Sequence, residues 1–79
     1  ILDQVSYMRV KVVIYPDERL REVIVEGKES IRVSDILRRV GLDEFGVIVR
    51  LRGKVVMEDE VVRDGDVVEI YEVMSGGKV

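Results

Sequence analysis

The amino-acid sequence predicts an α+β domain in which a mixed sheet of four to five strands packs on one face against one main helix. Two β-rich runs joined by a short turn open the chain, a segment of helical period follows, and the second half returns to strands. A hairpin, a helix laid across it and further strands form such a two-layer domain. The 79 residues suffice for one domain, expected over residues 1–74, with a flexible tail over residues 75–79.

The first two strands are expected to form a hairpin. The run YMRVKVVIY, residues 7–15, alternates in character, and one of its faces carries Met8, Val10, Val12 and Ile14. Pro16 and Asp17 are typical of a turn. The run REVIVEG, residues 21–27, supplies the second strand, and so short a connection favours antiparallel pairing with the first.

A short helix is predicted over VSDILRRVGL, residues 33–42. Ser34 is a favourable N-cap, and Asp35 lies in the first turn, where the helix dipole favours negative charge. Gly41 is well placed for the C-terminal cap. The apolar residues recur at helical spacing and define the face that is expected to contact the sheet: Ile36, Leu37 and Val40.

The second half of the chain is predicted to return to strands. GVIVRLRGKVV, residues 46–56, is interpreted as a strand, a turn around Gly53 and a brief returning strand. EDEVVRDGD, residues 58–66, is a polar connection with a turn at Gly65. VVEIYEV, residues 67–73, is the last strand, and its core pair is Val68 and Ile70.

The composition argues against several classes of function. The net charge of −3 and pI near 4.9 oppose nucleic-acid binding, because phosphates need a positive field. Without cysteine or histidine the chain lacks the usual nucleophile, general base and metal ligand, so we expect neither an enzyme nor a metal site. No apolar run reaches the roughly 20 residues that span a bilayer, which favours a cytoplasmic protein. Charged residues make up 37%, against about 25% in an average domain, a bias typical of thermophile proteins.

Two clusters of like charge have competing interpretations. An acidic cluster lacks the ligand spacing of a calcium loop and is interpreted as a solvated turn: Glu58, Asp59, Glu60, Asp64 and Asp66. A basic set could form an RNA-binding patch, but stacking aromatics are scarce and the total charge is acidic. Solvated outer faces are the favoured interpretation for this set: Arg19, Arg21, Arg38, Arg39, Arg50, Arg52 and Lys54.

The aromatic residues are interpreted as rims of the core, with a buried ring and a wet edge: Tyr7, Tyr15, Phe45 and Tyr71. If the core pair of the last strand faces the helix, Tyr71 and Val73 lie on the opposite face of that strand. Exposed there, they would form a partner-docking surface together with Ile48. Local packing of an edge strand explains the same residues equally well, and the two interpretations stay open.

The sharpest signal is the trio Ser75, Gly76 and Gly77, which follows directly on the last predicted strand. Small residues are also common in frayed tails. Glycine, however, lacks Cβ, so an extended Gly-Gly backbone can pass through a channel in which any side chain would clash. A carboxylate carried on such a tail could reach a buried phosphate in another protein and leave again.

Taken together, these features resemble the ubiquitin-like sulfur carriers, the family of ThiS, MoaD and the archaeal ubiquitin-like modifiers. The resemblance runs from Tyr7 to Gly77, and its best pieces are LRGKVV, RDGDVVEI and MSGG, in this order. It implies the β-grasp fold, in which the first and last strands pair in parallel in the middle of the sheet. It favours the ThiS-like branch.

The resemblance also implies the chemistry of the tail. The covalent site would be Gly77, where a thiocarboxylate and, before it, an adenylate form; Gly76, Ser75 and Met74 would give passage. An adenylating, E1-like enzyme would use ATP, and a sulfurtransferase or synthase would be the second partner. The chain itself would be a carrier, monomeric when free, that binds no cofactor permanently. Sulfur would pass to thiamin or molybdenum-cofactor biosynthesis, or to tRNA thiolation.

The tail departs from the family pattern in one respect, because Lys78 and Val79 follow the glycine whose carboxylate should be free. Either a protease removes the two residues, or they are an artificial remnant, or this member has lost the chemistry. Two alternatives to the carrier therefore remain. One is a ubiquitin-like protein modifier, in which Gly77 is joined to a lysine of a target. The other is a non-covalent β-grasp binding module with an inactive tail.

Overall fold

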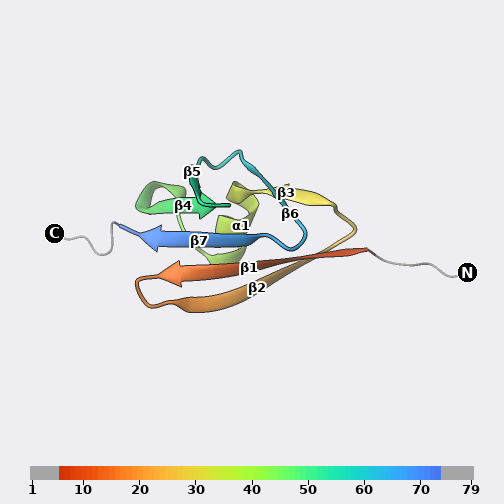
Figure 1. Cartoon of the computed structure of the whole chain (residues 1–79), viewed down its shortest axis with the longest axis horizontal. Helices are drawn as coiled ribbons and strands as arrows, with labels where there is room; N and C mark the ends of the chain where they lie inside the picture. The colour runs from red at the N-terminus through yellow and green to blue at the C-terminus, as the bar shows by residue number, and fades with distance from the viewer. Residues whose placement is uncertain (1–5, 74–79) are drawn as a thin grey trace, which may run out of the picture.

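The computed structural model describes residues 6–73. Along the chain, Figure 1 shows β1 (Tyr7–Tyr15), β2 (Arg19–Glu26), β3 (Ser30–Arg32), α1 (Val33–Val40), η1 (Glu44–Gly46, a 3₁₀ turn), β4 (Val47–Leu51), β5 (Lys54–Val56), β6 (Val61–Arg63) and β7 (Val67–Glu72). The strands predicted from period-two alternation are present within a few residues of their expected bounds.

Five strands form the main sheet in the order β2-β1-β7-β4-β5. β1 and β7 pair in parallel at its centre, from Lys11 opposite Val67 to Tyr15 opposite Tyr71, and the other neighbours are antiparallel. With α1 packed on this sheet, the predicted α+β fold of β-grasp type is confirmed (Figure 1). The parallel pair requires a long crossover between the two strands, and that crossover contains the helix.

Two short strands were not predicted from the sequence. β3 and β6 form a separate antiparallel pair, with Ile31 opposite Val62. Each has only three residues, too few to show an alternation, and each becomes a strand only because the fold brings the other alongside. Part of the predicted polar connection over residues 58–66 is therefore β6.

The prediction of Ser34 as the N-cap was wrong, because α1 begins at Val33 and Arg32 occupies the cap position. The first helical N–H groups donate to backbone carbonyls from a distant segment: Val33 to Glu60 O at 2.9 Å and Ser34 to Glu58 O at 2.9 Å. Asp35 lies in the first turn as predicted, and its Oδ2 accepts from Arg32 N at 3.1 Å. The C-terminal cap is Gly41, with φ of +79°, as predicted.

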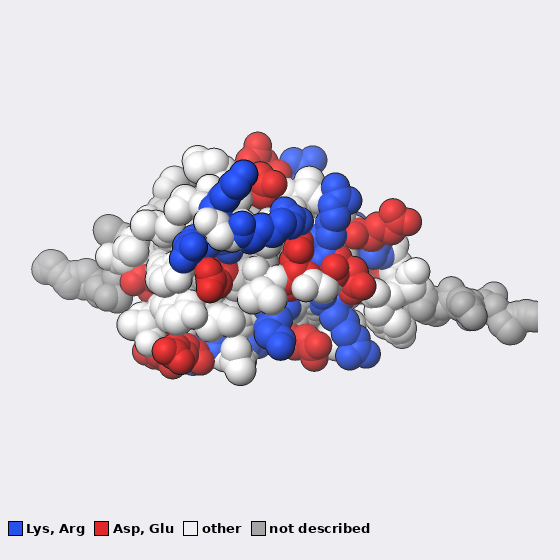
Figure 2. All heavy atoms as spheres, in the orientation of Figure 1, with Lys and Arg blue, Asp and Glu red and all other residues white. Residues whose placement is uncertain are grey.

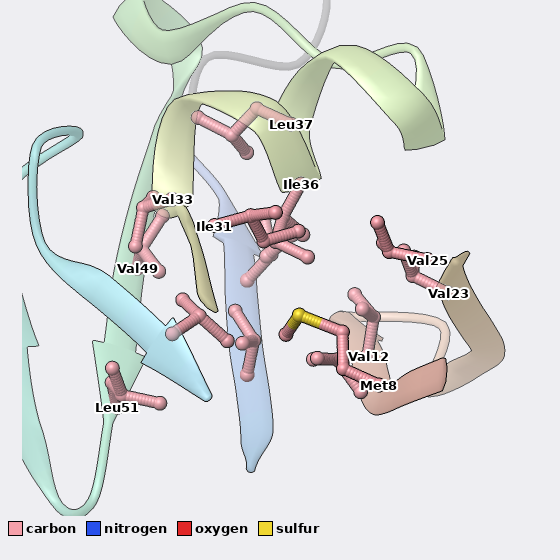
Figure 3. Close-up of a cluster of buried hydrophobic side chains, with 14 of the residues drawn as sticks. Met8, Val12, Val23, Val25, Ile31, Val33, Ile36, Leu37, Val49 and Leu51 are labelled. Carbon is pink, nitrogen blue, oxygen red and sulfur yellow. The ribbon is translucent and has the colours of Figure 1, made fainter. Parts of the chain in front are cut away.

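The core lies between α1 and the inner face of the sheet. Val33, Ile36 and Leu37 are buried on α1, and Figure 3 shows them above the strand side chains, among them Val12 and Val49. Every buried residue of the described chain is hydrophobic. The predicted core pair of β7, Val68 and Ile70, is fully buried, which fixes the side of that strand on which its alternate residues stand.

Candidate functional site

The end of β7 determines where the C-terminal segment starts. Val73, the last residue described, donates its backbone N–H to Gly46 O at 3.1 Å, so it is tied to the end of η1. Met74, Ser75, Gly76 and Gly77 lie outside the described residues, and their roles in passage and in covalent chemistry stay predictions.

The three predicted docking residues come together beside this point. Tyr71 alternates with the buried Val68 and Ile70 of β7, so its ring stands on the outer face of the sheet, away from α1. Ile48 of β4 lies opposite Tyr71 in the strand register and is 42% exposed. Val73 follows on the same side of the chain and is 54% exposed.

A fourth residue, Tyr15, belongs to this surface. It lies opposite Tyr71 in the parallel register, and the two rings stack with centroids 4.7 Å apart and planes at 10°. The sequence pattern placed Tyr15 at the rim of the core. Only the parallel pairing of β1 with β7 could have indicated its neighbour, and that pairing joins segments far apart in the chain. We call Tyr15, Ile48, Tyr71 and Val73 the outer apolar patch.

Charged residues border the outer apolar patch. Arg19 Nη2 lies 3.1 Å from Glu72 Oε1, and Arg50 Nη1 lies 3.7 Å from Glu69 Oε1. Desolvation, followed by the negative charge of Glu69, raises the pKa of Tyr15 above its usual value of 10.0. The Tyr15 phenol therefore stays neutral to higher pH than a free phenol does.

The other end of the outer face is built differently. Asp64 Oδ1 accepts from the backbone N–H of Arg9 at 2.8 Å. Asp66 Oδ2 accepts both from Arg52 Nη2 and from Arg63 N, each at 2.8 Å. These contacts support the interpretation of Asp64 and Asp66 as parts of a turn, since their oxygens connect β1, the β4–β5 turn and β6. We call Arg9, Arg52, Arg63, Asp64 and Asp66 the charged end.

Figure 2 shows this contrast on the surface. Uncharged atoms predominate toward the C-terminal end of β7, whereas Lys, Arg, Asp and Glu gather over the middle and the opposite end. The basic residues do not form a field of one sign, because acidic side chains lie among them (Figure 2).

Among residues 6–73, no group of three or more acidic, histidine or cysteine side chains is placed to hold a metal ion. No helix in the same range is long and apolar enough to cross a membrane.

A protein-family model that matches the sequence agrees with this fold and with the position of the last strand. The model of the ThiS family matches residues 10–77, a stretch that includes most of the main sheet, α1 and both glycines of the tail. Proteins of this family are small carriers and not enzymes. The chain therefore belongs to the ThiS family of ubiquitin-like sulfur carriers.

Proposed function

We propose that this protein carries sulfur as a thiocarboxylate on Gly77. An E1-like enzyme would join the Gly77 carboxylate to the AMP part of ATP, with pyrophosphate as the other product. Hydrosulfide would then attack the acyl carbon, displace AMP and leave the thiocarboxylate. This group would donate its sulfur in thiamin or molybdenum-cofactor biosynthesis or in tRNA thiolation. ATP is a substrate of the partner enzyme, and the carrier needs no resident cofactor.

The observation that carries the proposal is the extent of the family match, which continues past the last strand and ends at Gly77. β7 ends at Glu72, so both glycines come after the last strand in the sequence. Fully extended, residues 73–77 span at most about 17 Å. A carboxylate at that distance can enter an enzyme while the body of the carrier stays outside.

The body of the protein would supply recognition. The outer apolar patch adjoins the residue from which the tail starts, so an enzyme bound there would receive the tail at a fixed place. Aromatic side chains contribute strongly to such interfaces because they bury a large area with few rotatable bonds. We therefore assign Tyr71, Val73 and Ile48, with Tyr15, to docking of the adenylating enzyme. The sulfurtransferase or synthase would meet the same end of the molecule later.

Lys78 and Val79 stand after the acceptor glycine, so the proposal includes their removal before activation. Adenylation needs a free carboxylate on Gly77, and a peptide bond to Lys78 occupies that carbon. A chain that continues past Gly77 is then a precursor.

The test is the intact mass of the protein isolated from its own cells. A chain that ends at Gly77, with a fraction heavier by the replacement of one oxygen by sulfur, would support both trimming and the carrier role. If every molecule retained Lys78 and Val79, the carrier proposal would be rejected in favour of a non-covalent binding module.

A second candidate is a protein modifier, which the residues after the glycine pair favour, since ubiquitin-like precursors are trimmed in the same way. The same cells distinguish the two functions. Peptides in which Gly77 is joined to a lysine side chain of another protein, found without any thiocarboxylate, would identify a modifier.

A further inference from the structure

A groove runs along the side of the molecule, between α1 and the free edge of the main sheet. It encloses about 190 Å³. Its apolar wall is formed by side chains from three elements: Val33 and Leu37 of α1, Val47 and Val49 of β4, and Val56 of β5. β5 is the last strand of its sheet, so its outer edge pairs with no other strand within residues 6–73.

Large apolar side chains are exposed along this groove. Met57, which lines it, is 70% exposed, and Val55 beside it is 66% exposed. Phe45, in η1 next to the lining residue Glu44, is 83% exposed. Apolar side chains gathered at one groove, and not scattered singly, are typical of a surface that a partner covers.

The charges of the groove have one sign. Glu44 and Glu58 are the only charged residues among those that line it. Desolvation, then the negative charge of Glu58 and a hydrogen bond to it, raise the pKa of the Glu44 carboxyl, and Asp43 adds to the effect. Two carboxyl groups held this close repel each other when both are ionised. A cation placed between them would relieve that repulsion, which makes the acidic pair complementary to a basic residue.

The apolar wall and the acidic pair together indicate the chemistry of a partner. We propose that the groove binds a segment of a partner protein in which an apolar side chain stands next to Lys or Arg. The apolar side chain contacts Leu37, Val56 and Met57, while the cation pairs with Glu44 and Glu58. This contact needs neither Gly77 nor its activation, so it goes beyond the sulfur-carrier function. Ile48 also lines the groove, so this surface meets the outer apolar patch at β4.

The proposal is tested by NMR titration of the full ¹⁵N-labelled chain with a synthetic probe. The probe is a capped hexapeptide of alternating valine and lysine, and the comparison peptide has glutamate in place of lysine. We expect saturable shifts at the amides of Glu44, Val56, Met57 and Glu58 with the lysine peptide alone. Glu58→Lys should weaken this binding about tenfold, since a like charge replaces an ion pair.

Glu26→Lys is the matched control, because it changes the net charge equally at an exposed position on β2, the opposite edge of the sheet. It should leave the affinity unchanged within about twofold. Glu44→Lys gives a second test in the groove should Glu58→Lys fail to fold, as its amide spectrum will show.

Four results would overturn the proposal. They are the absence of saturable binding, equal binding of the glutamate peptide, equal loss of affinity in Glu26→Lys, and shifts confined to the outer apolar patch. Two other occupants would be recognised without peptide. Groove shifts that depend on protein concentration would identify a second copy of the chain, and groove shifts on removal of residues 74–79 would identify the tail; either result replaces the proposed partner.

Discussion

The two ends of the outer face of the sheet differ in chemistry. At the charged end, polar groups are paired within the protein: Asp66 accepts two hydrogen bonds of 2.8 Å, and Asp64 accepts one from the backbone of β1. At the outer apolar patch, Ile48 and Val73 stay exposed although both are apolar. β1 contributes to both ends, through Arg9 at one and Tyr15 at the other.

We expect the charged end to matter for stability and the outer apolar patch for function. The polar groups of the charged end are paired within the protein, so removing one should lower the free energy of unfolding. The outer apolar patch leaves apolar area in water, which a monomer gains nothing by keeping, and it adjoins the start of the tail. Removing apolar side chains of this patch should lower the rate of adenylation. Substitutions at the two ends should therefore affect different measurements.

The largest effect is expected from the tail that follows the outer apolar patch. In the chain trimmed to Gly77, removal of Gly76 and Gly77 should abolish adenylation, because no carboxylate reaches the nucleotide. Gly77→Ala should slow it about 100-fold, since a methyl group displaces the reacting carbon in a narrow channel. ATP–pyrophosphate exchange with the E1-like enzyme from the same cells measures both.

Thermal unfolding of the same variants is the control. The tail is predicted to follow the folded domain, so we expect neither variant to change the midpoint of unfolding. A large loss of stability on removal of the glycines would show that the domain extends beyond residue 74, and near-normal activation of Gly77→Ala would contradict the channel argument.

A smaller effect on activation is expected from the outer apolar patch itself. Tyr71→Ala removes the ring that stacks on Tyr15, and we expect kcat/KM for adenylation to fall roughly 10- to 30-fold, the loss typical of an aromatic interface anchor. Tyr7→Ala is the matched control, because Tyr7 is an exposed tyrosine at the far end of β1. If kcat/KM fell equally in both variants, the adenylating enzyme would not dock specifically on the outer apolar patch.

The contrast between the two ends also marks what the sequence could predict. Alternation located β1, β4 and β7 and the outward direction of Tyr71, because a strand with one buried face shows its register in its own residues. The docking set Ile48, Tyr71 and Val73 follows from that register. Their docking role itself stays a prediction.

What the sequence missed depends on contacts between distant segments. Tyr15 joins the outer apolar patch only through the parallel pairing of β1 with β7. The start of α1 is fixed by carbonyls of Glu58 and Glu60, so the local preference of Ser34 for the cap position did not decide it. β3 and β6 are likewise strands only because they pair with each other. No local window of sequence contains these partners.

At the charged end the expected effect is on stability. Asp66→Ala removes the acceptor for Arg52 Nη2 and Arg63 N, and we expect the free energy of unfolding to fall by about 1–2 kcal/mol. Adenylation of the folded protein should not change. Asp59→Ala, at an exposed position nearby, should stay within about 0.5 kcal/mol of the wild type in urea unfolding. If Asp66→Ala slowed activation instead, the two ends would not be functionally distinct.

The smallest expected effect is on the titration of Tyr15 in the outer apolar patch. Its pKa is raised in the folded protein by desolvation and by the charge of Glu69, so ionisation is harder folded than unfolded. The neutral phenol therefore supports folding below pH 10, and that contribution is lost as pH rises through the folded pKa. Tyr15→Phe cannot ionise, so its stability should fall less than that of the wild type as pH rises above 10. The absorbance difference between the two proteins should titrate with a midpoint above 10; a midpoint below 10 would mean that the ring is solvated and that the stack on Tyr71 does not persist in solution.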